Sequence, residues 1–253
     1  MRPYPDTPGP VRNGFVQIAL SPMATANHRT DSPPLGPTDS IITMTKVSDS
    51  PSPSSAAGAP VVRIGAVVLL SFLLGGLTSW AQGFLPDGLR SFANSASGWT
   101  VITALLVFWS RTRAVTAAVL GAISFVLLVL GYSAASELRG LFYNPLMFSA
   151  VGVAVGPFVG VAASWLRLTG TRAALAVALL AGIGIGESVY GLTVVRETTS
   201  PVYWVLIGVA GLALLTGLLV RRLRGALPVA LALGGTAVVA AAFHIAYSRL
   251  GGL

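Results

Sequence analysis

Seven apolar stretches, separated by short polar loops, occupy the chain from residue 64 onward. They cover residues 64–85, 98–109, 114–135, 146–166, 173–192, 202–220 and 226–247. A helix of about 20 apolar residues crosses the hydrocarbon core of a bilayer, and all but the second stretch come close to this length. A backbone in hydrocarbon must satisfy its own hydrogen bonds, so long runs without alternation favour helices over barrel strands. The pattern therefore predicts an all-α integral membrane protein with about seven transmembrane helices.

The second stretch is the weak one. Its strongly apolar part is residues 98–109, and it reaches full length only if residues 92–97, with Asn94 and Ser95, belong to it. One interpretation is an ordinary helix with a polar outer turn. The other is a re-entrant segment in which Asn94 lines a cavity, because irregular backbone at membrane depth is tolerated where it is buried in protein. We expect the ordinary helix.

Basic residues fall mainly on one side of these segments. Twelve of the sixteen precede the first segment or occupy alternate loops, and the other four are Arg90, Arg139, Arg196 and Arg249. Short cytoplasmic loops are enriched in Lys and Arg. This asymmetry predicts a cytoplasmic N-terminus and an extracytoplasmic C-terminus.

The first sixty residues differ from the rest in composition. Eleven of the sixteen prolines lie there, among Ser, Thr, Asp and Gly, and without a sustained apolar period. Such a segment cannot bury enough apolar surface to fold. We expect residues 1–60 to be a disordered Pro/Ser-rich cytoplasmic tail and residues 61–253 to be a polytopic helical membrane domain. Met44 is an alternative start, and Ser79 and Ala81 resemble a signal-peptide cleavage site, but the preceding run is long enough to be a retained span.

Composition narrows the function classes. Hydrophobic residues make up 54% of the chain and charged residues 9%, too little polar surface for a soluble fold. The net charge of +8 comes from arginines beside apolar runs, so we expect the lipid bilayer and not a nucleic acid as the partner. Cysteine is absent, which excludes disulfides and thiolate chemistry, and we expect no metal and no cofactor. Partner membrane subunits are not specified by any pattern.

Small residues are spaced for close helix packing. Gly152, Gly156 and Gly160 recur at every fourth position, and Gly182, Gly184 and Gly186 form a denser cluster. Spacing of this kind lets helix backbones approach closely. We also expect Pro157 to kink its helix, because it removes one backbone hydrogen bond.

A rhythm of about fifty residues runs through the predicted outer loops. The arginines at 90, 139, 196 and 249 each follow an aromatic residue, and complete loops add a proline and an acid. The aromatic residues are Trp80, Tyr132, Tyr190 and Tyr247; the others are Pro86, Pro145, Pro201, Asp87, Glu137 and Glu197. Three tandem two-helix hairpins with a closing helix would give this rhythm. So would selection for an aromatic belt at the outer interface.

Four polar residues map to one depth near the outer side: Gln82, Asn94, Glu187 and His244. Glu187 follows Arg172 by about 22 Å of helix, which places it near the outer headgroups as a partly hydrated side chain. Alternatively, Glu187 and His244 face a cavity as a proton-responsive couple. We expect the neighbouring outer charges to pair as Asp87 with Arg90 and Glu137 with Arg139.

Motifs of enzymes are missing from the sequence. It has no His-Glu-x-x-His helix, no phosphate loop and no Gly-x-Ser-x-Gly turn. An intramembrane hydrolase using Ser188 or Ser248 with His244 stays an alternative, but we expect no enzyme.

Two segments carry a family resemblance. The first is 75–86, with Gly75-Gly76-Leu77-Thr78-Ser79-Trp80-Ala81-Gln82-Gly83-Phe84-Leu85-Pro86, and the second is 92–99, with Phe92-Ala93-Asn94-Ser95 and Gly98-Trp99. They resemble a family of uncharacterised actinobacterial multi-pass membrane proteins, which implies a bacterial plasma membrane and no defined activity. For function we expect a small-molecule transporter or substrate-binding membrane component with an outward-facing polar site. The alternative is a non-transporting structural or interaction protein.

Overall fold

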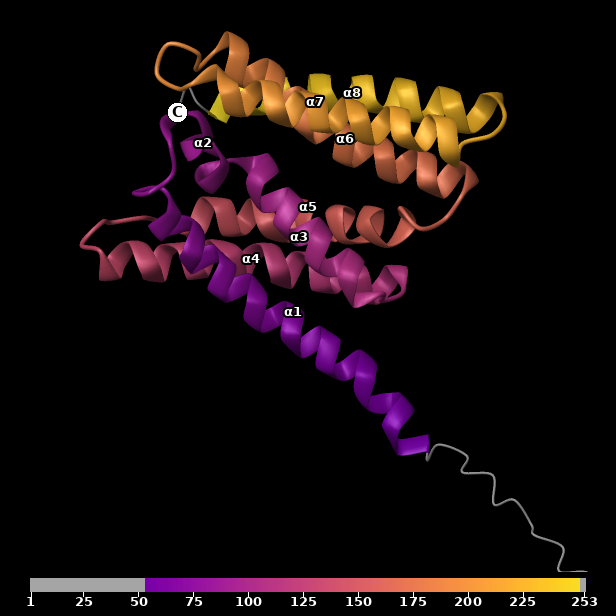
Figure 1. Cartoon of the computed structure of the whole chain (residues 1–253), viewed down its shortest axis with the longest axis horizontal. Coiled ribbons are helices and arrows are strands. Elements are labelled where there is room, and N and C mark those ends of the chain that lie inside the picture. The colour runs from indigo at the N-terminus through magenta and orange to yellow at the C-terminus, as the bar shows by residue number, and fades with distance from the viewer. Residues whose placement is uncertain (1–52, 251–253) are drawn as a thin grey trace, which may run out of the picture. The chain divides into compact units, whose positions relative to one another are not determined.

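The computed structural model describes residues 53–250, which form helices and no strand. The elements are α1 (Pro53–Ala81), α2 (Asp87–Arg90), the 3-10 helix η1 (Ser91–Asn94), α3 (Ala96–Ser110), α4 (Ala114–Leu138), α5 (Leu146–Trp165), α6 (Gly170–Thr193), α7 (Pro201–Arg221) and α8 (Ala226–Leu250) (Figure 1). Six helices are long and apolar enough to cross a membrane, and a bent seventh span adds to them if α2, η1 and α3 count together. The predicted fold class is confirmed.

The first helix starts earlier than the sequence pattern suggested. Because α1 begins at Pro53, the last eight residues of the predicted tail are helical. The helix also ends at Ala81, and residues 82–85 form turns that lead into α2. The expectations for residues 1–52, including disorder and the alternative start at Met44, lie outside the described residues.

Two groups of helices make up the membrane domain. In the first, α4 packs against α1 on one side and α5 on the other; in the second, α6 packs against α7 and α8. The groups meet through contacts of α6 with α5 and α3, and α3 packs mainly against the first group, above all against α5. The four helices α1, α4, α6 and α8 end at one end of the domain, where α3, α5 and α7 begin.

The helix pairing only partly follows the predicted hairpins. The α4–α5 and α6–α7 hairpins are closely packed pairs, whereas α1 packs mainly along α4 and only slightly along α3. Three equivalent hairpins are therefore not seen in the packing. The difference arises because α3 packs more against α5 than against α1.

Glycines make the closest helix contacts. A Cβ on Gly160 or Gly156 would collide with the backbone of α4 near Ala117 and Gly121. Gly182 and Gly186 face α8, and Gly184 faces Ile207 of α7, so the dense cluster serves two neighbours at once. The predicted role of these glycines in close packing is confirmed. Pro157 lies inside α5, which continues to Trp165.

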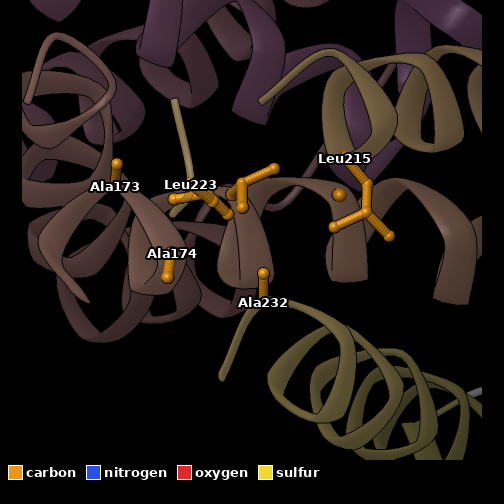
Figure 2. Packing of buried hydrophobic residues seen from close by; sticks show 7 residues of the cluster. Ala173, Ala174, Leu215, Leu223 and Ala232 are labelled. Atoms are coloured by element: carbon orange, nitrogen blue, oxygen red, sulfur yellow. The ribbon is translucent and has the colours of Figure 1, made fainter. Parts of the chain in front are cut away.

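The second helix group closes around small side chains at the end opposite the start of α3. Ala173 and Ala174 near the start of α6 and Ala232 of α8 are fully buried, and Leu215 and Leu223 from α7 and the following loop pack beside them (Figure 2). Alanine leaves room for the helices to approach, and the leucines fill the space between them. This end of the domain is thus closed by apolar packing.

Arginines at this closed end bind helix carbonyls. Arg167 donates to the Phe108 carbonyl and lies over the Phe108 ring, 4.0 Å from its centroid. Arg222 Nη1 donates to the Leu166 carbonyl over 2.7 Å. The last carbonyls of a helix have no partner within the helix, and a cation beside them is favourable. Arg167 and Arg222 therefore stabilise the ends of α3 and α5.

The weak second segment is broken. α2 with η1, and α3 after them, meet at an angle of 65° at Ser95. The expected single straight helix across residues 92–109 is therefore wrong. At 15 residues, α3 is about 22 Å long and shorter than the roughly 30 Å core of a bilayer, so its first residue lies below the level at which its neighbours end.

Candidate functional site

A polar pocket of about 810 Å³ lies at the end of the domain where α3 begins. Its polar and aromatic lining comes from the α1–α3 connection, the α4–α5 loop, the end of α6 with its following loop, the end of α8, and the starts of α3, α5 and α7. These residues are Gln82, Asp87, Arg90, Ser91, Asn94, Ser95, Trp99, Tyr143, Phe148, Glu187, Tyr190, Glu197, Thr198, Thr199, Ser200, Trp204 and Tyr247. We call this cavity the polar pocket and this end of the domain the polar end.

The start of α3 forms the floor of the polar pocket. Ser95 has extended backbone angles and caps the helix, its Oγ accepting from the Gly98 amide over 2.9 Å. Glu187 of α6 receives the two preceding amides: Ala96 donates to Oε1 over 2.9 Å and Ser97 donates to Oε2 over 2.7 Å. The Trp99 amide bonds to the Ser95 carbonyl. The amides of Ala96, Ser97 and Gly98, which have no partner within the helix, are thereby satisfied, and the Trp99 amide makes the first regular helix bond.

Glu187 is fixed by this contact. Its side chain is 2% exposed, so the expected partly hydrated position near the headgroups is wrong. Both oxygens accept hydrogen bonds, the arrangement of an ionised carboxylate, and the positive end of the α3 dipole faces it. Glu187 lies six residues before the end of α6 at Thr193, or about 9 Å along the helix, which matches the shortfall in the length of α3.

Of the other three predicted site residues, two line the polar pocket and one does not. Gln82 and Asn94 line the polar pocket with Glu187. Gln82 accepts a hydrogen bond of 3.0 Å from the Tyr132 hydroxyl, and Asn94 is exposed. His244 is not among the lining residues; its ring packs edge-on to Tyr190 at 6.3 Å, and its buried Nδ1 has no hydrogen-bond partner among residues 53–250. Because the amides of α3 occupy both oxygens of Glu187, the structure does not form the expected couple of Glu187 and His244.

Charges around the polar pocket pair only in part as expected. Asp87 and Arg90 form the predicted ion pair, with 2.8 Å between Oδ1 and Nη2. Arg139 does not pair with Glu137. It donates to the carbonyl and hydroxyl of Ser79 and lies 5.5 Å from the Trp80 ring centroid, because its side chain folds back onto the end of α1.

Aromatic side chains are the part of the lining that the sequence analysis missed. Tyr190 and Tyr247 line the polar pocket, and Tyr132 is 6% exposed, so these three do not form an aromatic belt in the lipid. Trp99 packs edge-on against Phe125, Tyr132 and Phe148. Among the predicted belt residues only Trp80 is widely exposed, at 48%. The sequence signal that could have indicated an aromatic lining is the recurrence of aromatic residues beside polar residues at one depth.

An apolar cavity of about 660 Å³ adjoins the polar pocket. It lies among α3, α5, α6 and α8, and five residues line both cavities: Ala96, Trp99, Phe148, Tyr190 and Tyr247. The Nε1 of Trp99 and the Oη of Tyr143 are buried without a hydrogen-bond partner in the described part of the chain. A buried donor without a partner is costly, and both side chains belong to the lining of the polar pocket.

Within residues 53–250, no three His, Asp or Glu side chains are placed so that they could hold a metal ion together. Burial of the Tyr143 ring in the α4–α5 loop raises the pKa of its hydroxyl, and the nearby Tyr132 adds to this effect. Tyr143 therefore stays a neutral hydrogen-bond donor at ordinary pH. The arrangement offers hydrogen bonds, one ion pair, free acidic charge and aromatic faces to a bound molecule.

Comparison with known proteins gives a family but no activity. No curated protein and no solved structure matches the chain. A family profile matches residues 54–252, nearly all of the described part. The chain belongs to this family, described as "Family of unknown function (DUF6518)".

Proposed function

We propose that this protein is a small-molecule transporter or a substrate-binding membrane component, with the polar pocket as its binding site. The observation that carries the proposal is the break at Ser95, which lowers the start of α3 and opens a cavity of about 810 Å³ between two helix groups. Discontinuous helices at the interface of two bundles form the substrate sites of many transporters. Pockets of this volume accommodate small organic molecules.

The alternative is a structural or interaction protein in which the polar groups only cap helices. Glu187 and Gln82 fit that alternative, because each already has a partner within the protein. The size of the pocket favours a ligand instead. A structural role would leave no reason for a cavity of this size beside a broken helix.

We also propose the orientation and location. The arginine distribution supports a cytoplasmic N-terminus and a polar end that faces the outside of a bacterial plasma membrane. The polar pocket would then open to the extracytoplasmic side. Because the chain has no cysteine, single cysteines introduced at Arg113 or Thr193 report their side cleanly with an impermeant maleimide on intact cells.

The binding site is tested with the purified full chain in lipid nanodiscs. A metabolite panel is screened for a rise in melting temperature, and hits are followed by flux into proteoliposomes. Asn94→Leu, which narrows the polar pocket, should abolish the stabilisation, whereas Thr193→Leu at the same end but outside the lining should retain it. Flat melting curves over the whole panel, with no flux, would favour the structural alternative.

An enzyme is a third possibility, and we propose that the protein is not one. Ser188 is buried against Gly208, and Ser248 is exposed in the last turns of α8. A hydrolase would require one of them to be activated by His244. A fluorophosphonate probe should therefore label neither serine; labelling that disappears in His244→Ala would overturn this.

A further inference from the structure

The polar pocket and the apolar cavity form one continuous amphipathic space. They share Ala96, Trp99 and Tyr247 among their common lining, and Trp99 is 1% exposed at the boundary between them. On one side of this boundary lie carboxylates, hydroxyls, two amides and one guanidinium. On the other lie aliphatic and aromatic carbons from α5, α6 and α8.

The apolar cavity opens sideways, toward the region a bilayer would occupy. Its two walls are α5 and α8, which are not packed against each other over their described residues. Met147 on the α5 wall is 51% exposed, and Ala242 and Ala246 on the α8 wall are also exposed. In a transmembrane domain such an opening faces acyl chains, so an apolar chain can enter from the bilayer without crossing water.

The charge of the polar pocket selects the headgroup. Three acids, Asp87, Glu187 and Glu197, and one base, Arg90, line it. Asp87 is paired with Arg90, and Glu187 already neutralises the positive end of α3, so that helix start is not free for an anion. The exposed carboxylate of Glu197 is left in the lining. Aromatic faces on the same lining favour a cation as well.

We infer that the site takes a cationic amphiphile, with its positively charged head in the polar pocket and its apolar chain in the cavity between α5 and α8. This inference rests on the proposed function and names its ligand class. Trp99 lines both spaces, so its indole ring lies beside the join between the head and the chain of such an amphiphile.

The test uses the full chain in nanodiscs of neutral lipid and three probes. Decanoylcholine carries a cationic head, an ester and a ten-carbon chain; decyl sulfate has the same chain length with an anionic head; choline is the head alone. Decanoylcholine at tenfold excess over its Kd should raise the melting temperature by about 3–6 °C. Decyl sulfate should give no saturable rise, and choline should bind far more weakly.

Substitutions in the two cavities test where the apolar chain and the cationic head of the amphiphile bind. Val151→Trp fills the cavity from α5 and should abolish the effect of decanoylcholine, while Val153→Trp, on the same helix but 62% exposed and outside the lining, should keep it. Ala246→Trp fills the cavity from α8 and serves if Val151→Trp does not fold. Glu197→Gln should weaken it about threefold, and less at high salt.

The outcomes separate this inference from the proposed function. Equal or tighter saturable binding of decyl sulfate, or decanoylcholine binding that survives both Val151→Trp and Ala246→Trp, overturns the amphiphile. If polar solutes bind and Asn94→Leu abolishes their binding while cavity filling has no effect, the polar pocket stands as a binding site and the amphiphile is wrong. If no probe and no metabolite binds, the proposed function fails with it.

Discussion

Replacing Glu187 removes the only side chain that accepts the first two amides of α3. Both bonds join a carboxylate to backbone N–H groups in a buried setting, 2.9 and 2.7 Å long. Hydrogen bonds to a charged group contribute about 1.5–3 kcal/mol each to stability. Glu187→Ala loses both and leaves two buried amides unpaired, so we expect it to lose about 3–5 kcal/mol, partly offset because no charge is buried.

Glu187→Gln is the finer perturbation. The amide keeps one oxygen acceptor and turns an NH₂ group toward the other backbone N–H, so one bond remains and the charge is lost. We expect a loss of about 2 kcal/mol, which for a domain of this size lowers the melting temperature by about 4–8 °C. The control is Glu137→Gln, because Glu137 is exposed and outside the polar pocket; its melting temperature should stay within about 1 °C of wild type.

Amide hydrogen exchange in nanodiscs localises the effect. The amides of Ala96 and Ser97 should be protected in the wild-type protein and exchange faster in Glu187→Gln and Glu187→Ala, while amides in the middle of α4 change only with global stability. If the two variants melt like wild type and the exchange of Ala96 and Ser97 is unchanged, Glu187 does not hold α3 and the site is built differently.

Three further perturbations test the packing and the pocket. Gly160→Ala places a Cβ against the backbone of α4 and should lose about 1–3 kcal/mol, whereas Gly217→Ala, with open space around it, should be neutral or gain up to about 1 kcal/mol, both measured by thermal melting. Ser124→Ala removes the 2.8 Å hydroxyl bond to Ser71 between α1 and α4 and should lose about 0.6 kcal/mol. Burial raises the pKa of Tyr143. The resulting contribution to the free energy of unfolding is fully present below the usual tyrosine pKa near 10 and decreases as the pH rises above it. Tyr143→Phe should therefore lose less stability at alkaline pH than wild type, and an unchanged pH profile would contradict this reasoning.

The helices could be predicted from the sequence because their length and apolarity are local properties. The bounds 146–166 and 202–220 differ from those of α5 and α7 by one residue at most. The break at Ser95 was also within reach, since a serine directly before an apolar run is a helix-start signal, and α3 begins one residue after it. Residues 92–97 obscured this signal, because joining them to residues 98–109 gave one helix of full length.

The site could be predicted only in part, because its key contact joins segments about ninety residues apart. Depth along the helices placed Gln82, Asn94 and Glu187 at one level, and the structure brings all three to the polar pocket. Depth does not give the face of a helix, so His244 was grouped with them although it does not line the pocket. The bond from Ser97 to Glu187 depends on how α3 docks on α6, which no local pattern encodes.

Cysteine labelling at Asn94 tests most directly whether the polar pocket binds small molecules. In the cysteine-free chain, Asn94→Cys should react rapidly with a water-soluble maleimide in nanodiscs, and the solute that most stabilises the protein should slow this reaction severalfold. Thr193→Cys, exposed at the same end but outside the lining, should react at the same rate with and without that solute. A thiol at residue 94 that does not react, or that reacts equally fast when the solute is bound, would contradict a ligand site in the polar pocket.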